Sequence, residues 1–122
     1  MKDIISFEDF LKVDIRAGTV TQVETVPKSK KLLKLQVDFG AEVGVRTILA
    51  GIAGAKAYGE VVDGAWKDSC LIGQHILAVI NLAPRQMMGI ESHGMLLAGH
   101  DDQDGIWLTT VCPAVLNGTE IG

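Results

Sequence analysis

Apolar and polar residues alternate along several stretches of this chain, and a period of two is typical of a β-strand with one buried face. The clearest alternation covers residues 33–39, where every second residue is apolar. A similar pattern covers residues 13–26, with Gly18 inside it. Because a glycine within a strand indicates a bulge or a sharp bend, we expect one long, bent strand followed by a regular one.

Further strands are predicted from apolar runs that lie between turn residues. They cover residues 43–50, 75–82, 93–99 and 106–111. Asp104-Gly105, just before the last of them, is a hairpin turn signal. Residues 59–73 predict a long irregular connection, and residues 112–122 predict a loop.

Helical signals are few. Ser6 has the side chain of an N-cap, and an acid, Asp9, follows three residues later. We expect one short helix there, with Phe7, Phe10 and Leu11 on its buried side. Residues 51–58 are rich in Ala and Gly and have room for one helical turn.

Short strands, brief helices and 14 glycines favour a small barrel over a sandwich. The pattern predicts an all-β fold, a five-stranded Greek-key OB-fold barrel with a short N-terminal helix and a C-terminal extension. The 122 residues are expected to form one domain, 1–122. OB barrels bind oligonucleotides with the face of strands two and three and with two loops, which join strands one to two and four to five.

The first of these loops, residues 27–31, opens a lysine cluster. The cluster comprises Lys28, Lys30, Lys31 and Lys34. Each ammonium group can act as a point charge that displaces a counterion from phosphate. A solvated loop that protects an edge strand is the plainer alternative.

The second loop, residues 83–92, carries Arg85 directly after Pro84. A guanidinium on a stiffened loop suits a bidentate contact to phosphate or to a base edge, and a structural salt bridge is the alternative. Asn81, just before this loop, has the side chain either to read a base or to pin a turn. Two segments with candidate chemistry thus fall on the two loops that an OB barrel uses.

The net charge of −4 argues mildly against nucleic acid, but its distribution weakens the objection. Residues 1–60 carry nine basic and eight acidic residues, whereas residues 61–122 carry two and seven. The chain has six aromatic residues, mostly at positions typical of a core. Scarce rings favour recognition of a folded RNA by its shape and phosphates over base stacking.

Several classes of protein are disfavoured. No apolar run approaches the ~18 residues of a membrane span, and the N-terminus carries acids where a signal peptide is apolar, so we expect a cytoplasmic protein. Ser92 has no base-and-acid pair beside it in the sequence. His93 and His100 form only a weak metal pattern. We therefore expect no enzyme activity, no metal and no cofactor.

One motif stands out between residues 81 and 99, which read NLAPRQMMGIESHGMLLAG. Earlier landmarks include residues 13–18, VDIRAG, and residues 50–52, AGI. In order and spacing these motifs resemble the tRNA-binding domain family, found at the C-terminus of many methionyl-tRNA synthetases and in free-standing dimeric tRNA-binding proteins. The resemblance covers nearly the whole chain.

This resemblance implies an OB barrel, a homodimer formed through C-terminal elements, and non-catalytic tRNA binding beside methionyl-tRNA synthetase, in cis or in trans. The residues at motif positions that would line or support the RNA groove are Lys31, Arg46, Asn81, Arg85, Ser92 and Met95. Two features depart from the usual pattern. Residues 26–32, VPKSKKL, lack an acid and gain a base, and the connection at residues 59–71 is longer than usual.

A related branch, the CsaA-type export chaperone, is the alternative, because it shares the barrel and the dimer but is associated with unfolded peptides. Its loop between strands four and five does not usually contain the motif at residues 89–95, GIESHGM. We therefore place tRNA binding first and the chaperone second.

Overall fold

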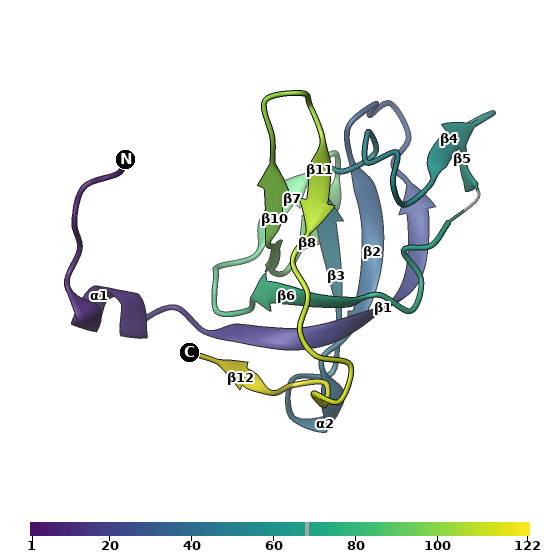
Figure 1. Ribbon diagram of the computed structural model, residues 1–122. Coiled ribbons are helices and arrows are strands. Elements are labelled where there is room, and N and C mark those ends of the chain that lie inside the picture. The colour runs from purple at the N-terminus through teal and green to yellow at the C-terminus, as the bar shows by residue number, and fades with distance from the viewer. Residues whose placement is uncertain (68) are drawn as a thin grey trace.

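A long curved strand organises the protein in the computed structural model, which describes residues 1–67 and 69–122 (Figure 1). This strand, β1 (Ile15–Thr25), pairs with β2 (Leu33–Asp38), β6 (His75–Val79) and β12 (Glu120–Ile121). Strand β2 also pairs with β3 (Val45–Ala50), and β6 with β9 (Met95–Leu96), in the order β3-β2-β1-β6-β9. All of these pairs are antiparallel.

The sheet curls until its two edges meet. The N–H of His93 donates to the carbonyl of Thr47 on β3 at 2.8 Å. The N–H of Leu49 donates to the Oγ of Ser92 at 2.9 Å. The fold is nearly all β and is consistent with the OB-like barrel predicted from the sequence, in which β1, β2, β3, β6 and β9 are the five barrel strands.

The core lies inside this curled sheet, and the predicted alternation of residues 33–39 is confirmed. Leu33, Leu35, Val37 and Phe39 are fully buried, while the residues between them are half-buried. Burial of each such side chain contributes about 1.5–3 kcal/mol relative to an exposed one.

Gly18 has a role that differs from the predicted bulge. The register of β1 shifts between Val20 and Gln22, so the irregularity lies after Gly18. A Cβ atom at position 18 would lie only 2.7 Å from the ring of Phe39. Glycine is therefore required because β1 crosses closely over the buried ring of Phe39.

Hairpins replace the irregular segments that the sequence predicts. Strands β4 (Glu60–Val62) and β5 (Ala65–Lys67) pair within the expected long connection, and β7 (Arg85–Met87) pairs with β8 (Ile90–Ser92) in the second loop. A third hairpin joins β10 (Ala98–His100) to β11 (Ile106–Leu108), as the Asp104-Gly105 signal predicts. Residues 51–58 form turns, so the helical turn expected there is absent.

Two short helices complete the described residues. Helix α2 (Gly40–Val43) joins β2 to β3. Helix α1 (Phe7–Leu11) begins as predicted, since the Oγ of Ser6 accepts from the N–H of Asp9 at 3.1 Å. The prediction that Phe7, Phe10 and Leu11 form a buried side is wrong within a single chain. All three are exposed, because the N-terminal arm, residues 1–14, stands away from the barrel (Figure 1). Neither helix is long and apolar enough to cross a membrane.

Candidate functional site

The loop between β1 and β2 presents three lysines in a fixed conformation. Lys28, Lys30 and Lys31 are exposed, and Lys28 adopts a left-handed backbone with φ of 66°. The Oγ of Ser29 accepts from the N–H groups of Lys31 and Leu32 at 3.3 and 3.1 Å. Within residues 1–67 and 69–122 these three lysines make no ion pair. Their charges are therefore available to an anionic ligand.

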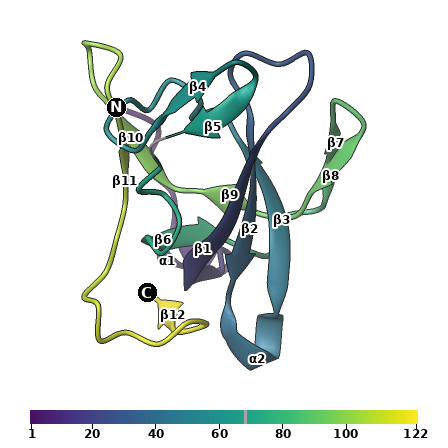
Figure 2. The same cartoon turned by 90° about the vertical axis from the view of Figure 1, so that its right-hand side faces the viewer.

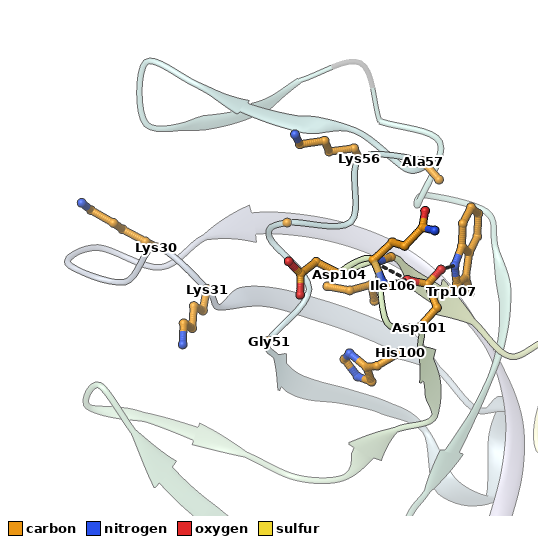
Figure 3. Close-up of a pocket in the computed structure, with 13 residues that line it drawn as sticks. Lys30, Lys31, Gly51, Lys56, Ala57, His100, Asp101, Asp104, Ile106 and Trp107 are labelled. Atoms are coloured by element: carbon orange, nitrogen blue, oxygen red, sulfur yellow. Dashed lines mark hydrogen bonds between the residues drawn. The ribbon is translucent and has the colours of Figure 1, made fainter.

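A groove of about 720 Å³ lies beside this loop (Figure 3). Lys30, Lys31 and Lys56 line one side of it, and the β10–β11 hairpin lines the other. The hairpin residues on that side include His100, Asp101, Asp104 and Trp107. We call this feature the lysine–tryptophan groove.

The hairpin side of the groove is held by Asp101. Its carboxylate accepts from the Nε1–H of Trp107 at 2.9 Å and from the N–H groups of Gly105 and Gln103 at 2.7 and 3.0 Å. These bonds, that of Trp107 first, lower the pKa of Asp101. Three donors to one carboxylate fix both the hairpin turn and the plane of the indole.

Lys34, the fourth lysine of the cluster, differs from the other three. It lies on β2, half-buried, with its Nζ 4.0 Å from the Oε2 of Glu24 on β1. Beside it on the same face, the Oγ1 of Thr47 donates to the Oε1 of Gln36 at 3.1 Å. The outer face of β2 therefore carries little net positive charge, in contrast to the loop, and its partners on β3 include the apolar side chains of Leu49 and Val45.

Arg46 and Asn81 tie the barrel together at a distance from the lysine loop. On β3, Arg46 is the strand partner of Val37, which lies near the C-terminal end of β2. The lysine loop lies at the other end of β2, before Leu33. The Nη1 of Arg46 donates to the carbonyl of Ile80 at 2.5 Å. Asn81 accepts from the N–H of Asp14 at 2.9 Å and donates to the carbonyl of Lys12 at 2.6 Å. Asn81 thus pins the segment before β1.

Arg85 and Ser92 face each other across the β7–β8 hairpin but differ in environment. Arg85 is exposed and makes no ion pair within the described residues. Ser92 is only 6% exposed, and its hydroxyl is engaged by Leu49. Of the two ways in which a motif residue was expected to serve the groove, the burial of Ser92 fits support and the exposure of Arg85 fits lining. Met95, at the start of β9, is half exposed beside Leu49 and His100 on a smaller hollow of about 380 Å³.

The sequence contained signals for some of the residues that were missed. Ile106 and Leu108 are half-buried while Trp107 between them is exposed, which is the alternation of a strand. That period places Trp107 on the outer face. Lys56 had no comparable signal, since it reaches the groove through the turns of residues 51–58 rather than through a strand.

The chemistry of this site suits an anionic ligand. The groove combines free ammonium groups with an exposed aromatic ring. In the part of the chain that the structure describes, no cluster of three or more His, Cys, Asp or Glu side chains is arranged to hold a metal ion.

Comparisons with known proteins point to a family. Residues 15–120 match the family described as "Putative tRNA binding domain". The methionine–tRNA ligase of Methanococcoides burtonii is 46% identical over 103 residues, which are 84% of this chain and 14% of that ligase. The methionine–tRNA ligase of Porphyromonas gingivalis is 40% identical over 117 residues, 96% of this chain and 15% of that protein. The chain thus spans only about one seventh of these relatives.

Solved structures that are similar over their full length include two proteins of different description. The MetRS related protein from Pyrococcus horikoshii superposes with a TM-score of 0.80 at 30% identity, over 99% of this chain and 100% of that one. The chaperone CsaA from Bacillus anthracis gives a TM-score of 0.78 at 33% identity, over 98% and 100%.

Proposed function

This chain belongs to the tRNA-binding domain family, and on that premise we propose that it binds tRNA without catalysing a reaction. The observation that carries the proposal is a set of lysines on the first barrel loop and in the lysine–tryptophan groove that make no ion pair within residues 1–67 and 69–122. Phosphate contacts dominate the affinity of proteins for nucleic acids. When such a lysine binds phosphate, no existing ion pair has to be broken, so the binding free energy is not reduced by that loss.

The β7–β8 hairpin supplies a second contact in this proposal. Figure 2 shows the hairpin standing off the barrel beside β3, on the same side as the loop between β1 and β2. Arg85 on that hairpin is exposed, and its guanidinium is suited to a bidentate phosphate contact. A folded RNA that rests against both projections would be recognised by the spacing of its phosphates rather than by its sequence.

Arg46, Asn81 and Ser92 support this surface rather than touch the RNA. Their polar atoms bind backbone groups of the barrel. Among the motif residues, the direct contacts we propose are Lys31, Arg85 and Met95, joined by Lys28, Lys30 and Lys56. Lys34 contributes less because Glu24 offsets its charge.

A homodimer is part of the proposal. Apolar side chains of the N-terminal arm are exposed, among them Ile4, Phe7 and Leu11 at 90%, 73% and 62%. The arm joins β1 at Ile15, whose partner on the C-terminal strand β12 is Ile121. An apolar helix next to the C-terminal strand β12 fits burial against a second copy, because burial of apolar side chains stabilises association.

The similarity to methionine–tRNA ligases suggests which protein this chain works with. Since methionine–tRNA ligases carry a similar segment, we infer a role beside methionyl-tRNA synthetase, and a tRNA ligand implies a cytoplasmic location. An export chaperone that binds unfolded peptides is the second candidate. The similarity to chaperone CsaA and the exposed apolar arm favour it.

Titration of the unmodified protein with bulk tRNA at several salt concentrations tests the proposal. We expect log affinity to fall linearly with log salt, by about 0.7–0.9 for each phosphate contact, and we expect no RNA cleavage or aminoacylation by the chain. Absence of binding at low salt would reject tRNA binding. Suppression of client aggregation under those conditions would then favour the chaperone.

A further inference from the structure

Trp107 is an exposed ring with a fixed orientation. The residue is 52% exposed, although it belongs to a paired strand, β11. Its Nε1–H donates to the Oδ2 of Asp101 at 2.9 Å, and Asp101 is itself held by the N–H groups of Gln103 and Gly105. The ring is therefore preorganised, so a ligand that stacks on it has little conformational entropy to remove.

The second tryptophan of the described residues serves the fold instead. Trp66 on β5 packs against the core, and a Cβ atom on Gly59 would lie 2.6 Å from its ring. Trp107 has no comparable packing role in its exposed part. Its position on the groove calls for another explanation.

The two sides of the lysine–tryptophan groove have opposite charge (Figure 3). Lys30, Lys31 and Lys56 are cationic, whereas Asp101 lies beside Trp107 and the carboxylate of Asp104 points toward the middle of the groove. Phosphate is attracted to the lysine side and repelled from the aspartate side. A nucleotide matches this polarity, since its base is uncharged and stacks on aromatic rings while its phosphate is anionic.

We propose that the lysine–tryptophan groove takes one unpaired nucleotide of the bound RNA, with its base stacked on Trp107 and its flanking phosphates on Lys30, Lys31 and Lys56. The volume of about 720 Å³ is within the range of small-molecule sites. The inference rests on the proposed RNA binding and adds a preference for RNA with a flipped or looped base. It revises the expectation that recognition uses phosphates and shape alone.

The test compares two oligomers of equal length and equal phosphate count, an oligoadenylate and an abasic ribose-phosphate chain. The unmodified protein is expected to bind the oligoadenylate about fivefold to a hundredfold more tightly, which is the usual contribution of one stacked base. Trp107→Leu should remove this preference and leave the salt dependence unchanged. Trp107→Phe, which retains a smaller ring, should keep part of it. Equal affinity of the unmodified protein for both oligomers would overturn the proposal.

A measurement without substitution guards against misfolded variants. The acrylamide-accessible part of the tryptophan emission of the unmodified protein comes mainly from Trp107, since Trp66 is packed against the core. It should become less accessible when the oligoadenylate binds, and unchanged accessibility at saturation would count against stacking. If the protein binds tRNA with a steep salt dependence but Trp107→Leu retains full preference, only the stacking inference fails. If no RNA binds at low salt, the proposed function fails and the inference fails with it.

Discussion

The hydroxyl of Ser92 accepts a hydrogen bond from the backbone N–H of Leu49 at 2.9 Å and so joins the end of the β7–β8 hairpin to β3. Both residues are buried. At this place the barrel closes through a side-chain hydrogen bond instead of a backbone one. The neighbouring bond, from the N–H of His93 to the carbonyl of Thr47, joins two backbone groups. Ser92 therefore belongs to the closure of the barrel, and the motif that contains it positions Arg85 across the hairpin.

Ser92→Ala is expected to lower the stability of the fold rather than the affinity for RNA. The substitution leaves the N–H of Leu49 buried without an acceptor, which costs about 1–3 kcal/mol. Urea unfolding measures this change in the free energy of unfolding. Thr110→Ala, which removes an exposed hydroxyl, is the matched control and should remain within about 0.5 kcal/mol of the unmodified protein. A stable Ser92→Ala variant with weakened tRNA binding would contradict this role.

Arg85→Ala is expected to lower the affinity for tRNA and to leave the stability of the fold unchanged. Loss of one charge-assisted hydrogen bond should weaken tRNA binding by about 1.5–3 kcal/mol, or about tenfold to a hundredfold, with unchanged stability because Arg85 is exposed. Gln86→Ala on the same exposed strand is the control. Filter binding of tRNA and suppression of client aggregation should be measured together. Normal tRNA binding with lost aggregation suppression would favour the chaperone.

The N-terminal arm should determine the oligomeric state. Replacing Phe7 and Leu11 by Ser removes two apolar side chains that are 73% and 62% exposed. Light scattering after size exclusion should give twice the chain mass for the unmodified protein and the mass of one chain for the variant. Val61→Ser, another exposed apolar position, should leave the dimer intact. A monomeric unmodified protein at micromolar concentration would reject the dimer.

Protonation of Asp101 at low pH should weaken the hydrogen bonds that hold the β10–β11 hairpin. Its pKa is lowered in the folded protein, first by the hydrogen bond from Trp107. The charged carboxylate therefore stabilises the hairpin above the ordinary pKa of about 3.9, and this contribution is lost as pH falls through the lower folded value. In a Trp66→Phe background, where Trp107 is the remaining tryptophan, emission should change below about pH 4. Asp101→Asn, which cannot titrate, should show no such step, and a step in that variant would assign it to another group.

Much of this architecture could be predicted from the sequence because it depends on local alternation. Residues 33–39 and the Asp104-Gly105 turn behave as their patterns predict. The hairpins β4–β5 and β7–β8 were missed, although Asp63-Gly64 is the same kind of turn signal, with φ of 51° and 78°. A turn at Met88-Gly89, with φ of 53° and 78°, has no such signal at its first position.

The candidate site was only partly predictable, for a physical reason. Exposure of a side chain depends on which distant segment covers it, and sequence periodicity does not report that. Ser92 is buried by the edge of β3, and the partners of Asn81 are the backbone groups of Lys12 and Asp14. The lysines of the first loop were identified correctly as exposed because their neighbours in sequence already form the turn.

If the lysines of the first loop hold RNA phosphates, the salt dependence of tRNA binding must change when their charge is reversed. The affinity for bulk tRNA should be compared across salt concentrations for Lys30→Glu/Lys31→Glu and for Lys2→Glu/Lys67→Glu. Both double variants change the net charge equally, but only the first alters residues of the lysine–tryptophan groove. We predict that the first variant loses affinity and that its slope of log affinity against log salt falls by about 0.7–0.9 for each lost phosphate contact, while the second keeps the slope of the unmodified protein. Equal slopes for the two variants would show that the lysine loop is a solvated surface that holds no RNA phosphate.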